Sequence, residues 1–477
     1  MPYRFRWVFC QLEALRHCFP PNLRQILNEL PETLDETYER VLKSINKAQK
    51  NNAHRLLQCL TVASRPLQVE ELAELLAFDF QATSSVGLPA LKEDWRWDDQ
   101  EEAVLSTCSS LIAIVWDGDS RIVQFSHFSV KEYLTSPRLL LSPHGDVSQF
   151  HIDLEPAHTI MAQACLTTLL RLDEYTGNVG AKRSPLVEYA AEHWVDHAQF
   201  EKVTSRVQDG MDELFDTSKQ HFAAWLRVHD IDENENWSFF TPSRRDSVGS
   251  PLYYAAFCGF YDLAERLIMK HPEEVNARGG RNLAPLPAAL YKRHFDIANL
   301  LYRHGAVVDV QGLEKRTPLF MASTFGQVDI MRWLLDHGAD ANARNRFDWT
   351  PLHYACVHLD AIQVLLEHNV DINSQNEDGD TPLCDALKLC PKEKVVDIVR
   401  RLVEHGADVN IRNRRHSTAL HQASLRGWLE VTRLLLSYGA RVDEKDDKGM
   451  TPLEVAVSFE YHEIEELLLE QSAVPQP

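Results

Sequence analysis

Residues 350–355 read TPLHYA and residues 405–410 read HGADVN, and variants of both stretches return along the C-terminal half of the chain. The tetrad that opens with Thr, Pro or Ala, and Leu begins at Thr317, Thr350, Thr381, Thr418 and Thr451. Successive starts differ by 33, 31, 37 and 33 positions, and two looser copies begin at Ser250 and Ala284. A period of this length indicates stacked helical units, because one unit cannot bury its apolar face alone.

The copy that starts at Thr317 shows why these residue types recur. We expect Thr317 to cap a helix with its hydroxyl, and Pro318 suits the first helical position because it has no N–H to leave unsatisfied. After a break at Gly326, apolar residues at helical spacing predict a second, longer helix that ends at Gly338. Each copy therefore predicts two helices joined by a short loop.

Two copies depart from the common length. Two residues are missing between Ala355 and Leu365, and four are added between Ala386 and Leu402. We expect both changes to fall in the loop that joins the two helices, where insertions are best tolerated.

This pattern is similar to the ankyrin repeat, in about seven copies that span residues 249–477. The resemblance implies that His353 and His421 tie adjacent hairpins by hydrogen bonds. It also implies that a protein partner binds the concave face, which the hairpin tips and the first helices form. Carried over by position, the candidate protein-binding residues are Arg346, Phe347, Trp349, Tyr291, Phe325, His358, Arg414, Arg415, Arg426 and Phe459.

Residues 346–349 read RFDW and make the most distinctive tip. A position that usually carries Asp and Gly offers a guanidinium group and two rings here, and Arg and Trp dominate interface hot spots. We interpret Arg346, Phe347 and Trp349 as the main contact for an acidic or amphipathic segment. The alternative is that the two rings pack on the neighbouring hairpin.

Composition limits the remaining functions. The chain has 477 residues, 44% of them hydrophobic and 25% charged, which predicts two to four ordinary globular domains. A formal net charge of −21 argues against nucleic-acid and anionic-membrane binding. No apolar run approaches 18 residues, and the nine cysteines lack paired metal-type spacing. We therefore expect a chain of the cytoplasm or the nucleus with reduced thiols.

The N-terminal half predicts helices over residues 34–45, 53–63, 69–76 and 101–111, followed by a hairpin around Asp117-Gly118-Asp119. Helices followed by a two-stranded wing indicate a winged-helix domain. The helix before the wing carries Glu101 and Glu102 but neither Lys nor Arg, so we do not expect it to bind DNA. A third hypothesis, a DNA-binding regulator, remains open at this point.

We divide the chain into a helical tail at 1–48, a winged-helix domain at 49–141, a helical linker at 142–248 and repeats at 249–477. The expected fold is thus mainly α: a winged helix and a helical bridge followed by an α-solenoid.

Several segments of this half resemble fungal NACHT–ankyrin proteins, relatives of NOD-like receptors in the signal-transducing ATPase class. They include FRWVFCQL at 5–12, LPETLDETY at 30–38 and HFSVKEYL at 127–134. The resemblance implies a nucleotide-binding module before the winged helix, and places His127 where such receptors carry a histidine that contacts the nucleotide phosphate. The alternative for His127 is a buried histidine satisfied by the wing.

A phosphate-binding loop requires Gly-Lys followed by Ser or Thr, and the sequence contains none. We therefore expect no nucleotide bound by this chain alone and no other cofactor. His193 and His197 stand four positions apart, which suits either a shared metal or a partly exposed helix face. No catalytic pattern stands out. The sequence thus predicts a non-enzymatic interaction protein, with the regulatory and sensing part of a nucleotide-gated receptor as the alternative.

Overall fold

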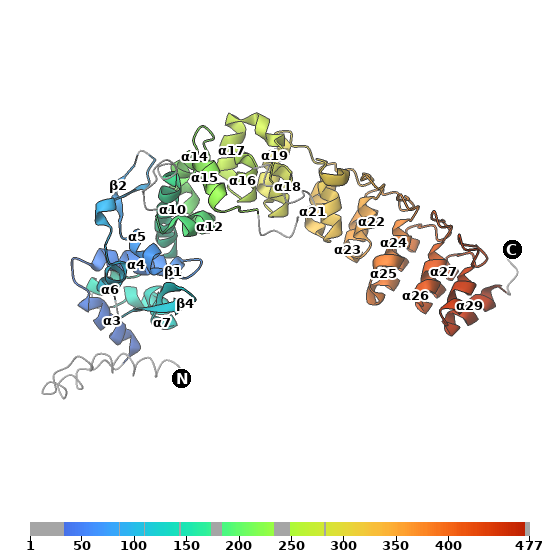
Figure 1. Cartoon of the computed structure of the whole chain (residues 1–477), viewed down its shortest axis with the longest axis horizontal. Helices are drawn as coiled ribbons and strands as arrows, with labels where there is room; N and C mark the ends of the chain where they lie inside the picture. The colour runs from blue at the N-terminus through green and yellow to red at the C-terminus, as the bar shows by residue number, and fades with distance from the viewer. Residues whose placement is uncertain are drawn as a thin grey trace. The chain divides into compact units, whose positions relative to one another are not determined.

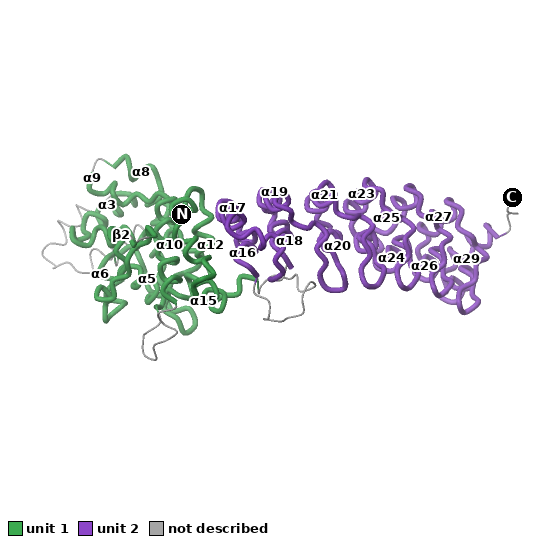
Figure 2. Tube along the Cα trace, turned by 90° about the horizontal axis from the view of Figure 1, so that it is seen from above, with its two compact units in different colours: residues 1–234 green, residues 235–477 purple. Residues whose placement is uncertain are grey.

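The computed structural model in Figure 1 describes residues 33–84, 86–108, 110–142, 145–172, 184–232, 249–280 and 283–472. The chain divides into two compact units, residues 1–234 and residues 235–477 (Figure 2). The FRWVFCQL segment and most of the predicted helical tail lie outside the described residues. The described part is mainly helical, so the predicted fold class is confirmed.

The first unit carries the predicted winged helix and bridge. Its elements in chain order are α3 (Leu34–Ser44), α4 (Lys50–Val62), β1 (Leu67–Gln68), α5 (Val69–Leu75), β2 (Phe78–Thr83), β3 (Pro89–Leu91), η2 (Glu93–Trp95), α6 (Gln100–Cys108), β4 (Ile112–Asp117), β5 (Ser120–Phe125), α7 (Phe128–Leu134), α8 (Pro137–Leu140), α9 (Gly145–Ser148), α10 (Leu154–Leu170), α12 (Val187–Ala198), α13 (Val203–Arg206), α14 (Gln208–Leu214) and α15 (His221–Val228).

The wing forms where the sequence predicts it. Strands β4 and β5 pair antiparallel, and Asp117 opposite Ser120 closes a two-residue turn in which Gly118 has a φ of 59°. The two-residue β1 adds to the outer edge of β5, which gives the order β1-β5-β4. The segment before α6, to which the sequence analysis assigns no strand, contains the antiparallel pair β2–β3.

Large aromatic side chains fill the core of the bridge. Trp194 of α12 meets Trp225 of α15 edge to face, with ring centroids 5.3 Å apart, and Phe215 packs against both. Two buried carboxylates nearby are paired with arginines: Glu71 with Arg65, and Glu74 with Arg96. Pairing is what makes a buried charge tolerable.

The second unit is a row of helix pairs that lie side by side (Figure 1). Its elements are α16 (Pro251–Phe257), α17 (Tyr261–Lys270), η3 (Pro272–Asn276), α18 (Pro285–Tyr291), α19 (Phe295–Arg303), η4 (Leu313–Lys315), α20 (Pro318–Thr324), α21 (Val328–Asp336), α22 (Pro351–Ala355), α23 (Leu359–Leu366), α24 (Pro382–Leu389), α25 (Lys392–Glu404), α26 (Ala419–Arg426), α27 (Leu429–Ser437), α28 (Pro452–Ser458) and α29 (His462–Ser472). Its described residues thus hold the seven predicted pairs.

The first helix of each pair is short and closely packed. Small side chains at one recurring position, among them Ala322, Ala355 and Ala423, are at most 1% exposed, so the next helix can approach closely. The tetrad threonines stand at the N-caps. Thr317 stands at the N-cap of α20, but its hydroxyl makes no cap hydrogen bond, so the predicted cap is wrong.

Neither length change falls in the loop between the two helices, so that prediction is wrong. The deletion shortens a first helix: α22 has five residues, whereas α20 has seven. The insertion lengthens a second helix: α25 has 13 residues, whereas α21 and α27 have nine. Four residues are about one helical turn, so the added turn keeps the apolar face of α25 in register.

An asparagine after the second helix links a repeat to the next one. Asn410 accepts the Arg441 N–H at 2.9 Å and donates to the Gly439 carbonyl at 3.0 Å. Asn276, Asn342 and Asn373 form the same double link. Asp309 occupies this position in one repeat and accepts the Asp340 N–H at 2.9 Å. A carboxylate has no N–H to donate, so this link is single.

Replacing Asp309 by Asn should stabilise the chain by about 1 kcal/mol. The amide would supply the missing donor toward the Gly338 carbonyl and would remove a carboxyl whose pKa is raised by burial. Urea unfolding of wild type and Asp309→Asn measures the difference. The matched control, Asn410→Asp, deletes a donor and should destabilise by a similar amount; an unchanged midpoint in Asp309→Asn would contradict the explanation.

Candidate functional site

The hairpin tips between repeats share one local design. At each of four tips an Asn or Asp side chain accepts two backbone N–H groups from the turn, as Asn345 does from Phe347 at 2.9 Å and Trp349 at 3.0 Å. The residues that play this part are Asn345, Asn376, Asn413 and Asp446. The turn is therefore fixed by its own side chain, whatever the other tip residues are.

Neighbouring tips are joined through their backbones. Arg346 N–H donates to the Glu314 carbonyl at 2.7 Å, Glu377 N–H to the Phe347 carbonyl at 3.0 Å, and Arg414 N–H to the Asp378 carbonyl at 2.9 Å. These bonds hold successive tips in one continuous edge. The side chains on that edge are consequently presented on a rigid support, which favours binding because little order is lost.

The RFDW tip places its groups in two directions. The Arg346 side chain is exposed, and its guanidinium carbon lies 5.1 Å from the centroid of the Phe347 ring. Trp349 is half-buried and packs on the first helix of its own repeat, with its ring 5.3 Å from that of Tyr354. Arg346 is thus exposed, half-buried Phe347 lies beneath its guanidinium, and Trp349 supports the tip.

Tyr354 and Arg316 belong to this cluster, although neither is among the ten candidate protein-binding residues. The Arg316 guanidinium carbon lies 5.3 Å from the Tyr354 ring centroid, and the Tyr354 hydroxyl accepts the Asn345 side-chain N–H at 3.1 Å. The available signal was the bulky Tyr354 in TPLHYA, where three other tetrad copies have Met321, Gln422 and Val455.

The tip at 414–416 is the other basic one. Arg414 and Arg415 are exposed, while the neighbouring Arg412 pairs with Glu444 at 3.1 Å. Exposed guanidinium groups on a fixed edge are available for a carboxylate of a partner.

The predicted first-helix residues form a second row. Phe325 and Phe459 cap the ends of α20 and α28 and are 38% and 51% exposed. Tyr291 ends α18 and stacks toward Phe257, and Arg426 ends α26 and donates to the Lys388 carbonyl at 2.5 Å. The hairpin tips lie before the first helices and the residues of this row lie at the ends of those helices. The tips and the row are therefore separated by one helix length, about 10 Å for seven residues.

His358 departs from this row because α22 is short. It is the residue just before α23, is half-buried, and its Nε2 lies 3.1 Å from the Thr324 carbonyl of the preceding repeat. A Cβ at Gly326 would come within 2.8 Å of the His358 ring, so the glycine leaves room for it. The structure thus uses His358 to join two repeats.

The histidines of the tetrads support the tips, as the resemblance implied. His353 Nδ1 accepts the Thr350 N–H at 3.1 Å, and Nε2 donates to the Asp380 carbonyl of the next tip at 3.1 Å. His421 bonds Thr418 and the Met450 carbonyl in the same way. Both roles require a neutral ring, because a protonated Nδ1 cannot accept. Burial accordingly lowers the pKa of His353 to about 4.

His127 is the N-cap of α7. Its Nδ1 accepts the Ser129 N–H at 3.3 Å and lies 2.6 Å from the Ser129 hydroxyl, and the ring lies beside that of Phe128, tilted by 36°. The hydroxyl of Ser129 also meets that of Tyr38 from α3, 2.8 Å away. The local geometry gives His127 a structural task, and its role as a nucleotide-state sensor stays a prediction.

His193 and His197 have different partners. His193 Nδ1 lies 3.1 Å from Asp196, whereas buried His197 contacts the Tyr189 hydroxyl at 2.8 Å and His158 at 2.9 Å. Burial lowers the pKa of His197 to about 3. Within the described ranges, no three His, Cys, Asp or Glu side chains are grouped to hold a metal ion.

Two further observations concern surfaces. Arg121 of the wing is paired with Glu70 and Glu101, at 2.8 Å each, so its charge is neutralised by these carboxylates. Of the helices that the structure describes, none is both long enough and apolar enough to cross a membrane.

Comparisons with known proteins identify both halves. The family described as ankyrin repeats (three copies) matches residues 252–345, 286–376, 338–413 and 388–476. The family described as the winged helix domain of GPI inositol-deacylase matches residues 38–152. The chain therefore contains a winged-helix domain of this type followed by ankyrin repeats.

Relatives match over part of their length. The azaphilone pigments biosynthesis cluster protein L of Monascus ruber is 31% identical over 316 residues, which are 62% of this chain and 65% of that protein. Protein phosphatase 1 regulatory subunit 27 of Homo sapiens is 44% identical over 55 residues, 12% of this chain and 36% of that protein. Among solved structures, the ankyrin repeat domain of Bcl-3 is 29% identical with a TM-score of 0.42, covering 46% of this chain and 98% of that chain.

The pKa of His353 predicts a pH effect on stability. An unfolded histidine binds its proton near pH 6.5, so His353 stabilises the fold fully above that pH and this contribution is lost as the pH falls toward 4. In His353→Gln, the slope of unfolding free energy against pH should fall by about 1 kcal/mol per unit in this window. Gln keeps the acceptor toward Thr350.

Asp385 provides the opposite control. Its burial and the charge of Asp380 raise its pKa to about 7, so the folded state keeps this proton to a higher pH than the unfolded state does. The contribution of Asp385 to stability therefore weakens as the pH rises. Asp385→Asn should therefore make the slope more positive. Equal slopes in wild type and His353→Gln between pH 4.5 and 6.5, measured by urea unfolding, would exclude the proposed contribution of His353.

Proposed function

We propose that this chain is a non-enzymatic interaction protein, and that its repeats bind an acidic or amphipathic segment of a partner across the concave face. The Arg346-Phe347-Trp349 tip would provide the main contact, and Arg414 and Arg415 would add charge. Tyr291, Phe325, Arg426 and Phe459 would form the opposite border. In this proposal the chain meets its partner in the cytoplasm or the nucleus, and the partner is not a membrane.

The observation that carries this proposal is the rigid presentation of exposed Arg and aromatic groups. The Arg346 guanidinium lies over the Phe347 ring on a tip that is held by Asn345 and by bonds to both neighbouring tips. Such a group loses little freedom on binding, and Arg and aromatic side chains are the usual hot spots. The acidic pairing of Arg121 supports a protein rather than a nucleic acid as the partner.

Selection of random peptides displayed on phage, with the purified full chain as target, would test the proposal. Selected peptides should be rich in Asp or Glu beside apolar residues, and Arg346→Ala/Trp349→Ala should weaken their binding by about 2 kcal/mol or more. The matched control is Arg433→Ala/Tyr438→Ala, an exposed arginine and a 45% exposed tyrosine at helix α27.

The result depends on both variants staying folded, which thermal unfolding monitored by circular dichroism checks. Binding that is equally strong in wild type and in the folded Arg346→Ala/Trp349→Ala variant would reject this tip as the main contact. Loss of binding in Arg433→Ala/Tyr438→Ala alone would place the site on the second helices instead.

A second candidate function is the regulatory and sensing part of a nucleotide-gated receptor. The match of residues 38–152 to a winged-helix domain, N-terminal to the helical bridge and the repeats, favours it. An in-frame transcript sequence that encodes Gly-Lys-Ser/Thr upstream of Met1 would support this function. An in-frame stop codon between Met1 and any such motif would contradict it.

A further inference from the structure

The sign of the exposed charges changes from one hairpin tip to the next. On three consecutive tips, the exposed charged residues are Arg346 and Asp348, then Glu377 and Asp378, then Arg414 and Arg415. The first of these tips is balanced. The second (Glu377, Asp378) is the acidic tip, and the third (Arg414, Arg415) is the basic tip. A partner that lies along this edge therefore meets two adjacent tips of opposite charge.

The three tips are direct neighbours, so a segment that binds the outer two also crosses the acidic one. Glu377 N–H donates to the Phe347 carbonyl at 3.0 Å, and Arg414 N–H donates to the Asp378 carbonyl at 2.9 Å. The first helices behind these tips, α22, α24 and α26, pack side by side. Because the axes of packed helices lie about 8–10 Å apart, successive tips are separated by about 10 Å. A segment that joins Arg346 to Arg414 therefore passes over Glu377 and Asp378.

Neither the acidic tip nor the basic tip is neutralised within the described part of the chain. Other charges of the same loops are neutralised, because Asp380 is paired with Lys388, and Arg412 is paired with Glu444 at 3.1 Å. By contrast, the side chains of the two tips form no hydrogen bond or ion pair with any residue that the structure describes. Their charges are therefore available to a partner.

Two adjacent tips of opposite charge restrict which segment fits. A uniformly acidic segment bound to Arg346 and to the basic tip would bring a carboxylate against Glu377 and Asp378. Like charges that face each other across an interface are unfavourable, whereas a Lys or Arg at that point would gain two carboxylate partners. At the basic tip the preference is reversed, because a guanidinium group binds a carboxylate through two parallel hydrogen bonds.

We propose that the partner segment carries its charges in a fixed order: a Lys or Arg faces the acidic tip, and an Asp or Glu faces the basic tip about 10 Å away. This inference rests on the proposed function, and it narrows the acidic or amphipathic segment to one that carries both signs. An extended segment spans this distance in about three residues. Because the two tips differ in sign, such a segment binds in one direction along the repeats.

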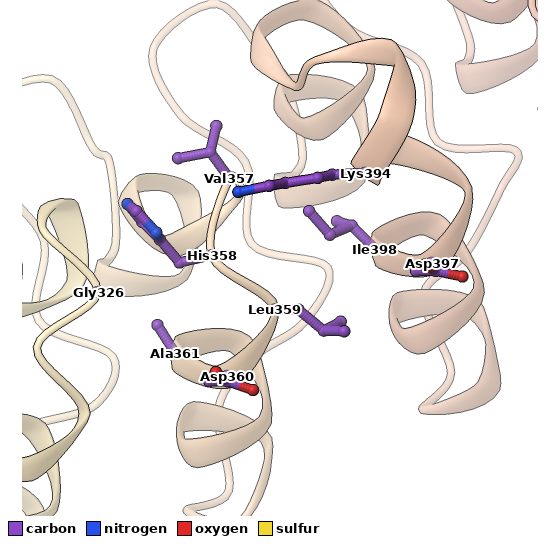
Figure 3. A pocket seen from close by; sticks show the side chains of 9 residues that line it. All are labelled: Gly326, Val357, His358, Leu359, Asp360, Ala361, Lys394, Asp397 and Ile398. Carbon is purple, nitrogen blue, oxygen red and sulfur yellow. The ribbon is translucent and has the colours of Figure 1, made fainter.

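The opposite end of the first helices offers a matched control. Asp360 and Lys394 are exposed there, beside a cavity of about 330 Å³ that lies between the starts of α23 and α25 (Figure 3). A second carboxylate at this cavity, Asp397, is paired with Arg400 at 3.3 Å. The control variant Asp360→Lys/Lys394→Asp therefore exchanges exposed charges of both signs, breaks no ion pair between described residues and leaves the hairpin tips unchanged.

Peptides that bind the hairpin tips provide the probe. Random dodecapeptides displayed on phage are selected on the wild-type full chain, and those that bind Arg346→Ala/Trp349→Ala more weakly are kept. The kept peptides should contain a Lys or Arg and an Asp or Glu about three positions apart. Fluorescence polarisation measures their affinity for each variant.

Exchanging the charges of the two tips tests the order directly. The quadruple variant Glu377→Arg/Asp378→Arg/Arg414→Glu/Arg415→Glu keeps the net charge of the chain and should bind the kept peptides about tenfold more weakly. Peptides in which the basic and acidic positions are exchanged should recover that affinity on the variant, which a misfolded variant could not provide. If the quadruple variant does not fold, the acidic-tip and basic-tip double variants give the same test, each with one peptide charge reversed.

The control variant should bind every kept peptide as the wild type does. Kept peptides without a basic residue, or kept peptides that bind the charge-exchanged variants as tightly as wild type, would overturn the charge order and leave the proposed function intact. The charge order is also overturned if the exchanged peptides do not bind the folded variants. If no selected peptide depends on Arg346 and Trp349, the charge order and the proposed function are both rejected.

Discussion

The structure of the second unit depends on one constraint: a helix pair of this size has two apolar faces and cannot cover either by itself. Each pair must therefore be held against its neighbours at a fixed spacing. Hydrogen bonds do this at three heights. His353 and His421 bond to the next hairpin tip. After each second helix, an asparagine bonds to the end of the next second helix, as Asn276, Asn342, Asn373 and Asn410 do. His358 and Cys390 bond back to the end of the preceding first helix. Surface residues between these bonds are free to vary.

This division explains what the sequence could predict. The repeat, its helices and the roles of His353 and His421 follow from residues that the stacking requires, so they recur and can be counted. The winged helix was predictable because Asp117-Gly118-Asp119 is a strong turn signal between alternating strands. The strands β2 and β3 were missed because β3 has only three residues and the pairing shifts register between Asp79 and Thr83. A two-residue strand such as β1 leaves no periodicity to detect.

The candidate surface was only partly predictable, for a different reason. Position in the repeat told us that Arg346, Phe347 and Trp349 lie at a tip, but not that Trp349 turns back onto Tyr354 while Arg346 stays exposed. Side-chain direction depends on neighbours from two repeats, such as Arg316. The length changes were visible in the sequence, but their consequence was not. A missing residue pair can shorten a loop or a helix, and only packing decides which.

The substitution of Asp309 for the recurring asparagine bears on how the repeats come apart. One junction in the row, between the α18–α19 pair and the α20–α21 pair, lacks a donor that its counterparts have. In a linear array each junction must hold independently, so transient opening concentrates at the weakest one. We expect the five C-terminal pairs, which carry the hairpin tips of the proposed binding surface, to remain intact as one cooperative block after the first two have opened. Ligand binding to that block would then leave the opening of the first two pairs unchanged.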